Sequence, residues 1–392
     1  MQIPVLSFFT GAGFLDLGFR GTSFKVIWRN EFNRWFVRGF SYGMLSLTGS
    51  EFEAKVHNTD SIINVGPKEI LRQAFGDGGR PTTFGFIGGP PCPDFSVGGK
   101  NRGGEGEKGK LSEVYVRRIK ELLPSFFVFE NVPGLLRTEK HRAFLLQLMR
   151  TLDADYALDL KILNALDQGA PQDRERVFLI GFARGWLKRE QGTRVPLHVN
   201  DSLLRTSFLA NSRQFSLPGL NGTHWFPWPS DKKYSDAKKR YDWPKQVPFG
   251  SDPPKPAGIP EELMVSSYIC DLEEITRLPN GLEGFEPKSR KFSQIAEGDD
   301  SRKSFKRLHR WRYSPAAAYG NNEVHLHPMQ PRRLTVREAL RIQTVPDKYI
   351  LPSDMPLSHK FKTIGNGVPV KLATAVASSI EKVLKGDFNG NF

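Results

Sequence analysis

The sequence predicts an open α/β domain in which a mostly parallel sheet carries helices on both faces. Up to about residue 183, short apolar runs alternate with stretches of helical periodicity, the pattern of a parallel sheet covered by helices. Proline, glycine, tryptophan and lysine then become frequent, and regular patterning resumes only from residue 331. We therefore expect an α/β domain at 1–183, a smaller irregular domain at 184–330, and a return segment at 331–392 that completes the first domain.

The expected strands and helices alternate along the chain. Six apolar runs have the length of buried strands and lie at residues 5–9, 24–28, 83–87, 126–129, 161–164 and 177–182. Four segments between them have helical periodicity, at residues 34–42, 67–75, 114–122 and 141–152. The return segment adds two helices, at about 335–343 and 370–384.

The composition indicates a polyanionic partner. The chain has 392 residues, with 56 lysines and arginines against 42 acidic residues, so its net charge is +14. A basic surface favours nucleic acid, because phosphate backbones release counterions when they bind to it. An unspecialised basic surface is the alternative. Two basic clusters lie in the irregular domain: Lys232, Lys233, Lys238, Lys239 and Arg240, then Arg302, Lys303, Lys306, Arg307, Arg310 and Arg312.

Several classes of protein are excluded. No apolar run approaches the roughly 20 residues that cross a bilayer, and the first residues lack the pattern of a signal peptide, so we expect a cytoplasmic protein without membrane contact. Cys92 and Cys270 are far apart, which argues against a disulfide framework or a cysteine-rich zinc site, and Cys270 is expected to be a structural or free thiol. His325 and His327 lack further ligand-type partners, so no metal site is predicted.

A glycine turn follows the first expected strand. Phe9-Thr10-Gly11-Ala12-Gly13 would let a cofactor approach the backbone closely. Glu31 ends the second strand, where a nucleotide-type pocket holds the two hydroxyls of a ribose, and Asp60, after a further expected strand, could accept a hydrogen bond from an adenine amino group. Taken singly, each acidic residue is better explained as a helix cap or a solvated side chain.

A proline-flanked cysteine is more specific. Gly88-Gly89-Pro90-Pro91-Cys92-Pro93-Asp94-Phe95-Ser96 places the thiol directly after an apolar strand, where an α/β sheet displays its reactive groups. An ordinary thiol with a pKa near ~8.5 is mostly protonated at neutral pH, so a nucleophilic role requires nearby positive charge or a helix N-terminus. A buried structural cysteine is the alternative, although the flanking prolines and glycines leave little to pack against. We predict that Cys92 is a nucleophile.

Two further segments deliver polar groups. The next apolar strand ends in Glu130-Asn131-Val132, beside the cysteine turn if the two strands are neighbours. In the segment 168–176, Gln172, Arg174 and Arg176 alternate, so an extended chain would point them to one side to grip a base or phosphate. The glycine-rich stretch 98–109, with Lys100 and Arg102, is predicted to be a mobile loop.

These motifs, in this order, resemble the DNA cytosine carbon-5 methyltransferases of bacterial restriction-modification systems. The resemblance covers roughly residues 5–182 and 331–377. The chain departs from the family pattern at Phe14, where the family often has a second glycine, and at Pro93, where it often has glutamine. Six motifs carry the resemblance: the glycine turn, Pro91-Cys92, Glu130-Asn131-Val132, Gln172-Asp173-Arg174-Glu175-Arg176, Arg332-Arg333-Leu334-Thr335-Val336-Arg337-Glu338-Ala339 with Gln343 and Pro346-Asp347, and Gly365-Asn366-Gly367-Val368-Pro369.

The resemblance implies a Rossmann-like, S-adenosylmethionine-dependent methyltransferase. Cys92 would add to carbon 6 of cytosine, Glu130 would hold the exocyclic amine and nitrogen 3, and Arg174 and Arg176 would steady the base. The cytosine would be flipped out of double-stranded DNA, the loop 98–109 would close over it, and residues 184–330 would read the sequence. The implied cofactor pocket consists of Phe9, Gly11, Gly13, Glu31, Phe32, Asp60, Pro91, Leu111, Asn366 and Val368.

Partners and alternatives follow from the same comparison. The resemblance implies a monomer, since each methylation needs one flipped base and one active site, and a cognate restriction endonuclease acting on the same site. The main alternative is a carbon-5 methyltransferase for RNA of the transfer-RNA type, although the basic, tryptophan-containing middle domain favours DNA. A binding protein that has lost the reaction is opposed by Cys92, Glu130 and the two arginines. A nicotinamide-dependent oxidoreductase would explain only the glycine turn and Glu31.

Overall fold

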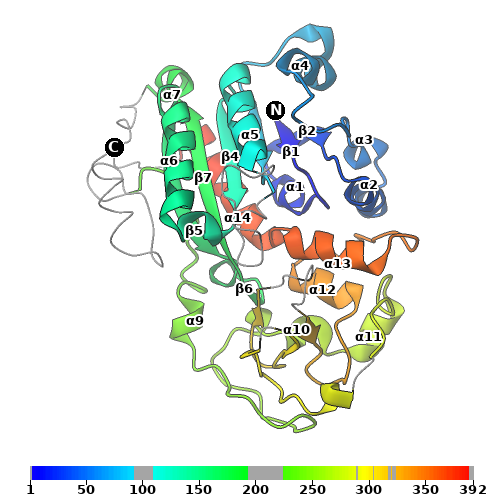
Figure 1. The fold of residues 1–392 in the computed structure, drawn as a ribbon. Coiled ribbons are helices and arrows are strands. Elements are labelled where there is room, and N and C mark those ends of the chain that lie inside the picture. The colour runs from blue at the N-terminus through cyan, green and yellow to red at the C-terminus, as the bar shows by residue number, and fades with distance from the viewer. Residues whose placement is uncertain are drawn as a thin grey trace.

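The computed structural model describes residues 2–91, 109–192, 224–287, 290–302, 304–316, 319 and 324–387. A six-stranded sheet forms its centre (Figure 1), built from β1 (Ile3–Phe8), β2 (Phe24–Asn30), β3 (Gly85–Gly88), β4 (Phe126–Asn131), β5 (Tyr156–Asn164) and β7 (Glu175–Ala183). The order across the sheet is β2-β1-β3-β4-β7-β5. The first four strands of this order run parallel, whereas β7 is antiparallel to both of its neighbours. The predicted mostly parallel α/β fold is confirmed.

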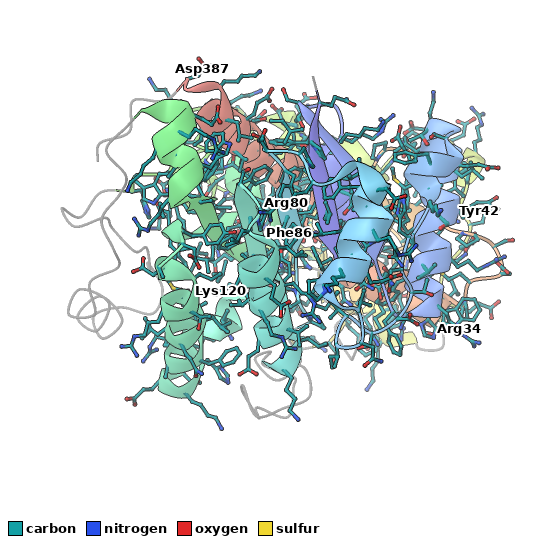
Figure 2. All side chains as sticks on the ribbon, turned by 90° about the horizontal axis from the view of Figure 1, so that it is seen from above. Arg34, Tyr42, Arg80, Phe86, Lys120 and Asp387 are labelled. Atoms are coloured by element: carbon teal, nitrogen blue, oxygen red, sulfur yellow. The ribbon has the colours of Figure 1, made fainter. Side chains whose placement is uncertain are left out.

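Helices cover both faces of the sheet because its side chains alternate. Phe127 and Phe129 of β4 enter one apolar core, and Phe126 and Val128 enter the other. Helices α4 (Pro67–Phe75), α5 (Gly109–Leu122) and α6 (Glu139–Asp153) close the first core, while α1 (Phe14–Phe19), α7 (Arg184–Gln191) and α14 (Val370–Lys385) close the second. Figure 2 looks down on these layers, with Phe86 of β3 in the interior and the Arg34 and Tyr42 side chains of α2 (Arg34–Thr48) at the periphery.

Most predicted elements occur close to their expected bounds, but β5 differs. It begins at Tyr156 rather than at residue 161. The additional stretch contains Asp159, a buried acid that breaks the apolar pattern of a strand. Asp159 is tolerated because its oxygens contact His224 Nδ1 at 2.7 Å and accept a hydrogen bond from the Phe226 amide at 3.0 Å. Several helices also had no predicted counterpart, among them α7, α3 (Glu51–Ala54) and α13 (Leu357–Asn366).

The return segment packs against the sheet. It contains α12 (Val336–Ile342), α13 and α14. The side chain of Thr335 caps α12 and the Glu338 carboxylate accepts the Thr335 amide at 2.7 Å, a reciprocal pair that satisfies the first turn. Helix α14 crosses α1 closely, since a Cβ on Gly18 would lie 2.6 Å from the Ala373 carbonyl carbon. In the part of the chain that the structure describes, no helix is long and apolar enough to span a bilayer.

The middle of the chain has little regular structure (Figure 1). Trp186 of α7 and, later in the chain, Trp225, Phe226 and Trp228 pack in the second core of the sheet, so packing of the first domain extends past residue 183. The division of the chain at residues 183 and 184 stays a prediction. The remaining elements of the structure are short. Two strand pairs form, β6 (Gln172–Asp173) with β9 (Ser314–Pro315) and β8 (Lys306–Arg307) with β10 (His325–Leu326), and three short helices lie in the middle region: α9 (Ala237–Arg240), α10 (Ser266–Ile269) and α11 (Leu272–Arg277). Across the whole described chain, 3-10 turns lie at Gly76–Gly78, Pro133–Leu136, Leu166–Gln168, Glu261–Leu263 and Arg290–Ser293.

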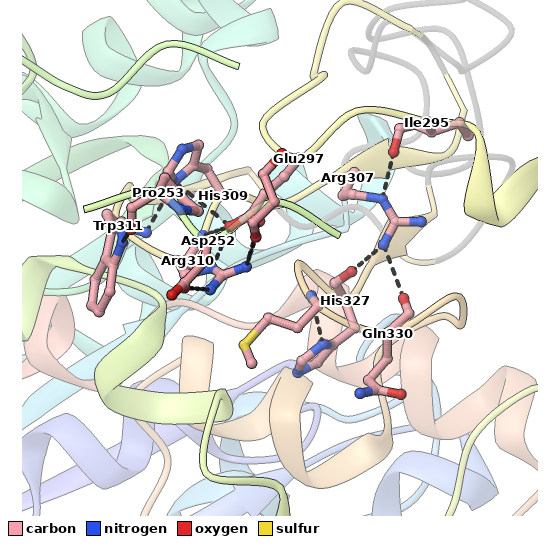
Figure 3. A network of polar contacts seen from close by, with 12 residues as sticks. Asp252, Pro253, Ile295, Glu297, Arg307, His309, Arg310, Trp311, His327 and Gln330 are labelled. Atoms are coloured by element: carbon pink, nitrogen blue, oxygen red, sulfur yellow. Dashed lines mark hydrogen bonds and ion pairs between the residues drawn. The ribbon is translucent and has the colours of Figure 1, made fainter. Parts of the chain in front are cut away.

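Two arginines of the second basic cluster hold this irregular region together (Figure 3). Arg307 is fully buried, and its guanidinium donates to the carbonyls of Ile295 at 2.8 Å and Gln330 at 2.9 Å. Arg310 forms two 3.0 Å bonds with the buried carboxylate of Glu297. The hypothesis that the whole cluster contacts phosphates is therefore wrong for Arg307, whose charge is enclosed by backbone carbonyls.

Candidate active site and cofactor cradle

The predicted functional residues gather at one edge of the sheet. Strands β1, β2, β3 and β4 are parallel and all end there, so the residues that follow them meet, as in other open α/β sheets. Glu31 directly follows β2, Pro91 follows β3, and Glu130 lies at the end of β4. Strand β7 runs in the opposite direction and therefore starts at the same edge, which brings Arg176 opposite Leu163 and close to the end of β4.

Glu130 and Arg176 form an ion pair at this edge. Arg176 Nε lies 2.9 Å from Glu130 Oε1, and both side chains are buried. Burial raises the pKa of Glu130, because removing water penalises its charged form, while the charges of Arg176 and Arg174 oppose that rise. The result is a carboxyl group that keeps a proton to higher pH than an exposed glutamate and is held in one orientation.

The cysteine turn leads directly past this pair. A Cβ on Gly89 would lie 2.6 Å from Glu130 Oε2, so only glycine allows the chain to pass so near the carboxylate. The Asn131 side chain donates to the Pro90 carbonyl at 3.3 Å and ties the turn to the end of β4. The expectation that the two turns are neighbours is met up to Pro91. Cys92, Lys100 and Arg102 lie outside the described residues.

Arg174, between β6 and β7, links this segment to the C-terminal motif. It is fully buried, and its Nη2 donates to the carbonyl of Gly365, in the last turn of α13. Gln172 is also fully buried, and among the described residues its side-chain amide has no hydrogen-bond partner. The predicted alternation thus places Gln172, Arg174 and Arg176 inside the protein, and a base gripped by them would have to enter it.

The glycine turn after β1 has an unusual backbone. Gly11 and Gly13 have φ of 59° and 74°, and Phe9 has φ of 55°, which is a strained conformation for a residue with a side chain. Glu31 stabilises the turn, since its Oε2 accepts the Gly11 amide and its Oε1 accepts the Asn33 amide, both at 2.8 Å. Burial raises the pKa of Glu31, whereas the hydrogen bonds from the Asn33 and Gly11 amides oppose that rise. The ring of Phe32 beside it is 72% exposed.

Asp60 is positioned by a pair of asparagines that sequence analysis missed. Asn30, the last residue of β2, is buried, and its side chain donates to Asn58 Oδ1 at 3.0 Å and to the Asp60 carbonyl at 2.9 Å. The strand expected before Asp60 is reduced to an isolated bridge between Asn30 and Asn58. Asn30 stands at a predicted strand end, but nothing in the sequence marks Asn58 as its partner.

A buried ion pair beneath the glycine turn was also missed. Arg29 Nε lies 3.0 Å from Asp16 Oδ2, and the hydroxyl of Ser7 donates to Asp16 Oδ1 at 2.7 Å. These residues come from β2, α1 and β1, so the pair joins the elements on both sides of the turn. Nothing in the local sequence pattern predicts that Asp16 or Arg29 is buried. Each charge is tolerated in the interior only because the other lies beside it.

The remaining predicted pocket residues differ in how far they are buried. Asn366 is exposed at the end of α13, and Val368 is buried just before α14. Leu111, in the first turn of α5, packs against the first core. From the return segment, the hydroxyl of Tyr349 donates to the Ala12 carbonyl at 2.8 Å, a contact to the turn that sequence analysis did not anticipate. The described site residues therefore form two groups at this edge of the sheet, one around Glu130 and one around Gly11.

Comparisons with known proteins agree with this arrangement. The profile of the C-5 cytosine-specific DNA methylases matches residues 3–382. The chain is 40% identical over 390 residues to the type II methyltransferase M.NmeDI of Neisseria meningitidis serogroup C, covering 98% of this chain and 84% of that protein. It is 30% identical over 399 residues to the type II methyltransferase M.MthTI of Methanothermobacter thermautotrophicus, covering 99% of this chain and all of that protein.

A solved structure supports the fold. The S. pombe Dnmt2 methyltransferase superposes with a TM-score of 0.58 over the full length of both chains, at 11% identity, which is a likeness of fold alone. The profile match also spans almost the whole sequence, including the middle region between the motifs. The chain therefore belongs to the family of C-5 cytosine-specific DNA methylases.

Proposed function

We propose that this enzyme, a DNA (cytosine-5-)-methyltransferase, modifies cytosines within one specific duplex sequence and thereby protects DNA in a restriction-modification system. The observation that carries the proposal is the Glu130–Arg176 pair, held at the end of β4 beside the turn that leads to Cys92. The type II relatives M.NmeDI and M.MthTI support the protective role. A cognate endonuclease would recognise the same sequence.

The cofactor of this enzyme is S-adenosylmethionine, and the cradle around Gly11 fits it. A carboxylate offers about four lone-pair sites, and the backbone amides use one on each oxygen of Glu31, leaving acceptors for the two ribose hydroxyls. The exposed ring of Phe32 is available to cover the adenine, and Asp60 to accept its amino group. A bound cofactor supplies a sulfonium methyl group. Phe9, Gly11, Gly13, Pro91, Leu111, Asn366 and Val368 would form the rest of the pocket.

In the proposed reaction, Cys92 activates the base. Its thiolate would form a bond to carbon 6 of cytosine and so move electron density onto carbon 5, which could then accept the methyl group that the cofactor would supply. Solvent water would then accept the proton from carbon 5, the electron pair of that C–H bond would re-form the double bond between carbons 5 and 6 and expel the Cys92 thiolate, and nitrogen 3 would return its proton to Glu130. Glu130, with its raised pKa, donates a proton to nitrogen 3 while its other oxygen accepts from the exocyclic amine.

Arg174 and Arg176 would steady the base in this pocket. Arg176 already holds Glu130 in place, so it fixes the proton donor relative to the base. The buried position of these residues requires the cytosine to leave the duplex stack, at a cost of a few kcal/mol. Of the predicted loop 98–109, which would close over the base, residues 98–108 lie outside the described residues, and Gly109 begins α5 instead.

Exposed cations of the middle region would hold the DNA backbone. Lys238 pairs with Asp173 at 2.7 Å and Lys233 pairs with Glu262, so these two charges are partly engaged. The exposed Lys232 and Lys239 and the half-buried Lys306 form no ion pair within the described part of the chain and are the better candidates for phosphate contacts. Residues 184–330 would read the bases, and the protein would act as a monomer in the cytoplasm, on the nucleoid.

One experiment tests activity, nucleophile and specificity together. The protein is expressed in a host that lacks cytosine methylation, and the host DNA is sequenced after bisulfite treatment, with Cys92→Ser as the control. We expect protected cytosines within one short recurring sequence, absent in the control. Absence of protection by soluble protein would overturn the proposal and direct the same assay to transfer RNA. Methylation without any sequence preference would contradict the protective role alone.

A further inference from the structure

Gly367 occupies a position where the backbone does not require glycine. It follows α13 with φ of −66° and ψ of 155°, an extended conformation open to any residue. Its surroundings do require glycine. A Cβ at this position would lie 2.9 Å from Cε2 and 3.1 Å from Cγ of the Phe14 ring, and closer still to Cδ2. The ring of Phe14 therefore fills the space that a side chain at residue 367 would need.

Phe14 is itself held firmly. It is 2% exposed, and it begins α1 directly after the glycine turn. Its ring meets that of Tyr349 edge to face, with centroids 5.9 Å apart and planes at 78°. Tyr349 in turn donates to the Ala12 carbonyl at 2.8 Å, within the turn. The ring cannot move away from residue 367 without disturbing the contacts that shape the turn.

The segment around Gly367 is held from two sides. Phe14 contacts it from the start of α1, and Arg174, between β6 and β7, donates to the carbonyl of Gly365. Asn366 lies between these two contacts, and Val368 follows directly. These are the residues assigned above to the closing wall of the cofactor pocket.

We propose that Phe14 and Gly367 are a matched steric pair that positions Asn366 and Val368 against the turn Gly11–Gly13 and so sets the shape of the cofactor pocket. The inference rests on the proposed pocket and adds two positioning residues to it. It also gives a reason for the phenylalanine at position 14, where the chain departs from its family. The ring of Phe14 fills the volume that a side chain at residue 367 would need, and glycine at 367 leaves that volume free.

The test is a double-mutant cycle with Gly367→Ala and Phe14→Ala. We expect Gly367→Ala to weaken binding of S-adenosylmethionine, measured by calorimetry, by roughly tenfold or more, because overpacking displaces Asn366 and Val368. In the Phe14→Ala background, where the ring is gone, the same change should alter the dissociation constant by less than about twofold. If Phe14→Ala does not fold, Phe14→Val replaces it, since valine lacks the ring atoms that approach residue 367.

Two control variants separate positioning from stability. Gly181→Ala on β7 creates a comparable clash, with a Cβ 2.5 Å from Cζ of Phe127, but far from the cofactor turn. Gly185→Ala, on the exposed side of α7, meets nothing within 4 Å. We expect Gly181→Ala to lower the midpoint of thermal unfolding without changing the dissociation constant, and Gly185→Ala to change neither.

Three outcomes would overturn the pair. They are wild-type affinity in Gly367→Ala, equal weakening in the presence and absence of the Phe14 ring, and a matching loss of affinity in Gly181→Ala. Failure of the wild-type protein to bind S-adenosylmethionine would instead contradict the proposed pocket, so the two failures are distinguishable.

Discussion

Arg176 and Glu130 contact each other because their strands run in opposite directions. Strand β4 ends at the edge of the sheet where β7 begins, and the pair meets there with Arg176 Nε 2.9 Å from Glu130 Oε1. Had β7 been parallel to β4, its first residues would lie at the far edge of the sheet. The antiparallel direction of β7 thus brings Arg176 to the carboxylate of Glu130, which it orients.

Replacing the carboxyl group of Glu130 should remove catalysis and spare cofactor binding. In Glu130→Gln the amide can still hydrogen-bond the base, but it cannot transfer a proton to nitrogen 3. Proton transfer by a positioned group contributes typically about 10²–10⁴-fold, so we expect methyl transfer to fall by that order. The dissociation constant for S-adenosylmethionine, measured in parallel, should stay at the wild-type value. A fully active Glu130→Gln enzyme would exclude the proposed acid role.

The pH dependence of methyl transfer should report the same group. Burial raises the pKa of Glu130, so its acid form persists to higher pH than in an exposed glutamate. A step that needs the protonated carboxyl slows as pH rises through this pKa, which predicts a descending limb in the rate profile. The limb should be missing from the residual activity of Glu130→Gln. An identical descending limb in both proteins would assign it to another group.

Glu31 should control cofactor affinity. Its carboxylate shapes the glycine turn through the amides of Gly11 and Asn33 and retains acceptors for a ribose. Glu31→Gln keeps the size but removes the charge and half of the acceptor oxygens, which we expect to cost about 1.5–3 kcal/mol, or roughly 10- to 100-fold in the dissociation constant. Calorimetry with S-adenosylmethionine measures this directly. An unchanged constant would remove Glu31 from the pocket.

Lys306 and Arg307 are sequence neighbours with opposite expected roles. Arg307 is enclosed by carbonyls, so Arg307→Met should destabilise the protein by about 3–5 kcal/mol, seen in denaturant unfolding. Lys306→Ala should leave stability nearly unchanged and reduce the salt dependence of DNA binding by about 0.9 in the log–log slope, as for one lost phosphate contact. A stable Arg307→Met protein with a flattened salt dependence would reverse this assignment.

Asp167 should make stability depend on pH. Burial, together with Asp236, Asp173 and Glu175, raises the pKa of Asp167 from 3.8 to about 6, although the Ala237 amide opposes the shift. Between these two values the folded protein binds more protons than the unfolded chain, so the free energy of unfolding falls as pH rises from about 4 to about 6. Asp167→Asn can still accept the Ala237 amide and does not ionise.

The variant should therefore be more stable than wild type above pH 6 and similar to it near pH 4. Denaturant unfolding at several pH values checks this, with the exposed Asp77→Asn as the control. A constant difference between Asp167→Asn and wild type across the range would contradict the linkage.

By itself, the sequence determined the α/β fold, the order of the motifs and the residues that end strands. These features depend on local pattern: strand and helix periods, glycine and proline at turns, and reactive side chains immediately after apolar runs. Glu31 and Glu130 could be identified in this way because their neighbours in the chain place them at the edge of the sheet. The alternation of Arg174 and Arg176 predicted a shared side, but not their burial or their contacts with Gly365 and Glu130.

Only the tertiary structure decided which distant residues meet. Asp16 with Arg29, Asn30 with Asn58, and Phe14 with Gly367 are pairs whose members carry no local signal for each other. The same holds for Arg307, which looked like a phosphate contact in a basic run and is a buried support, and for Asp159, whose burial within β5 depends on His224. The physical reason is that burial and close packing are properties of the folded chain. A buried charge needs an opposite charge or a hydrogen-bond partner, and a glycine in a close contact needs a neighbour that fills the space, and in these pairs the partner lies far away in the sequence.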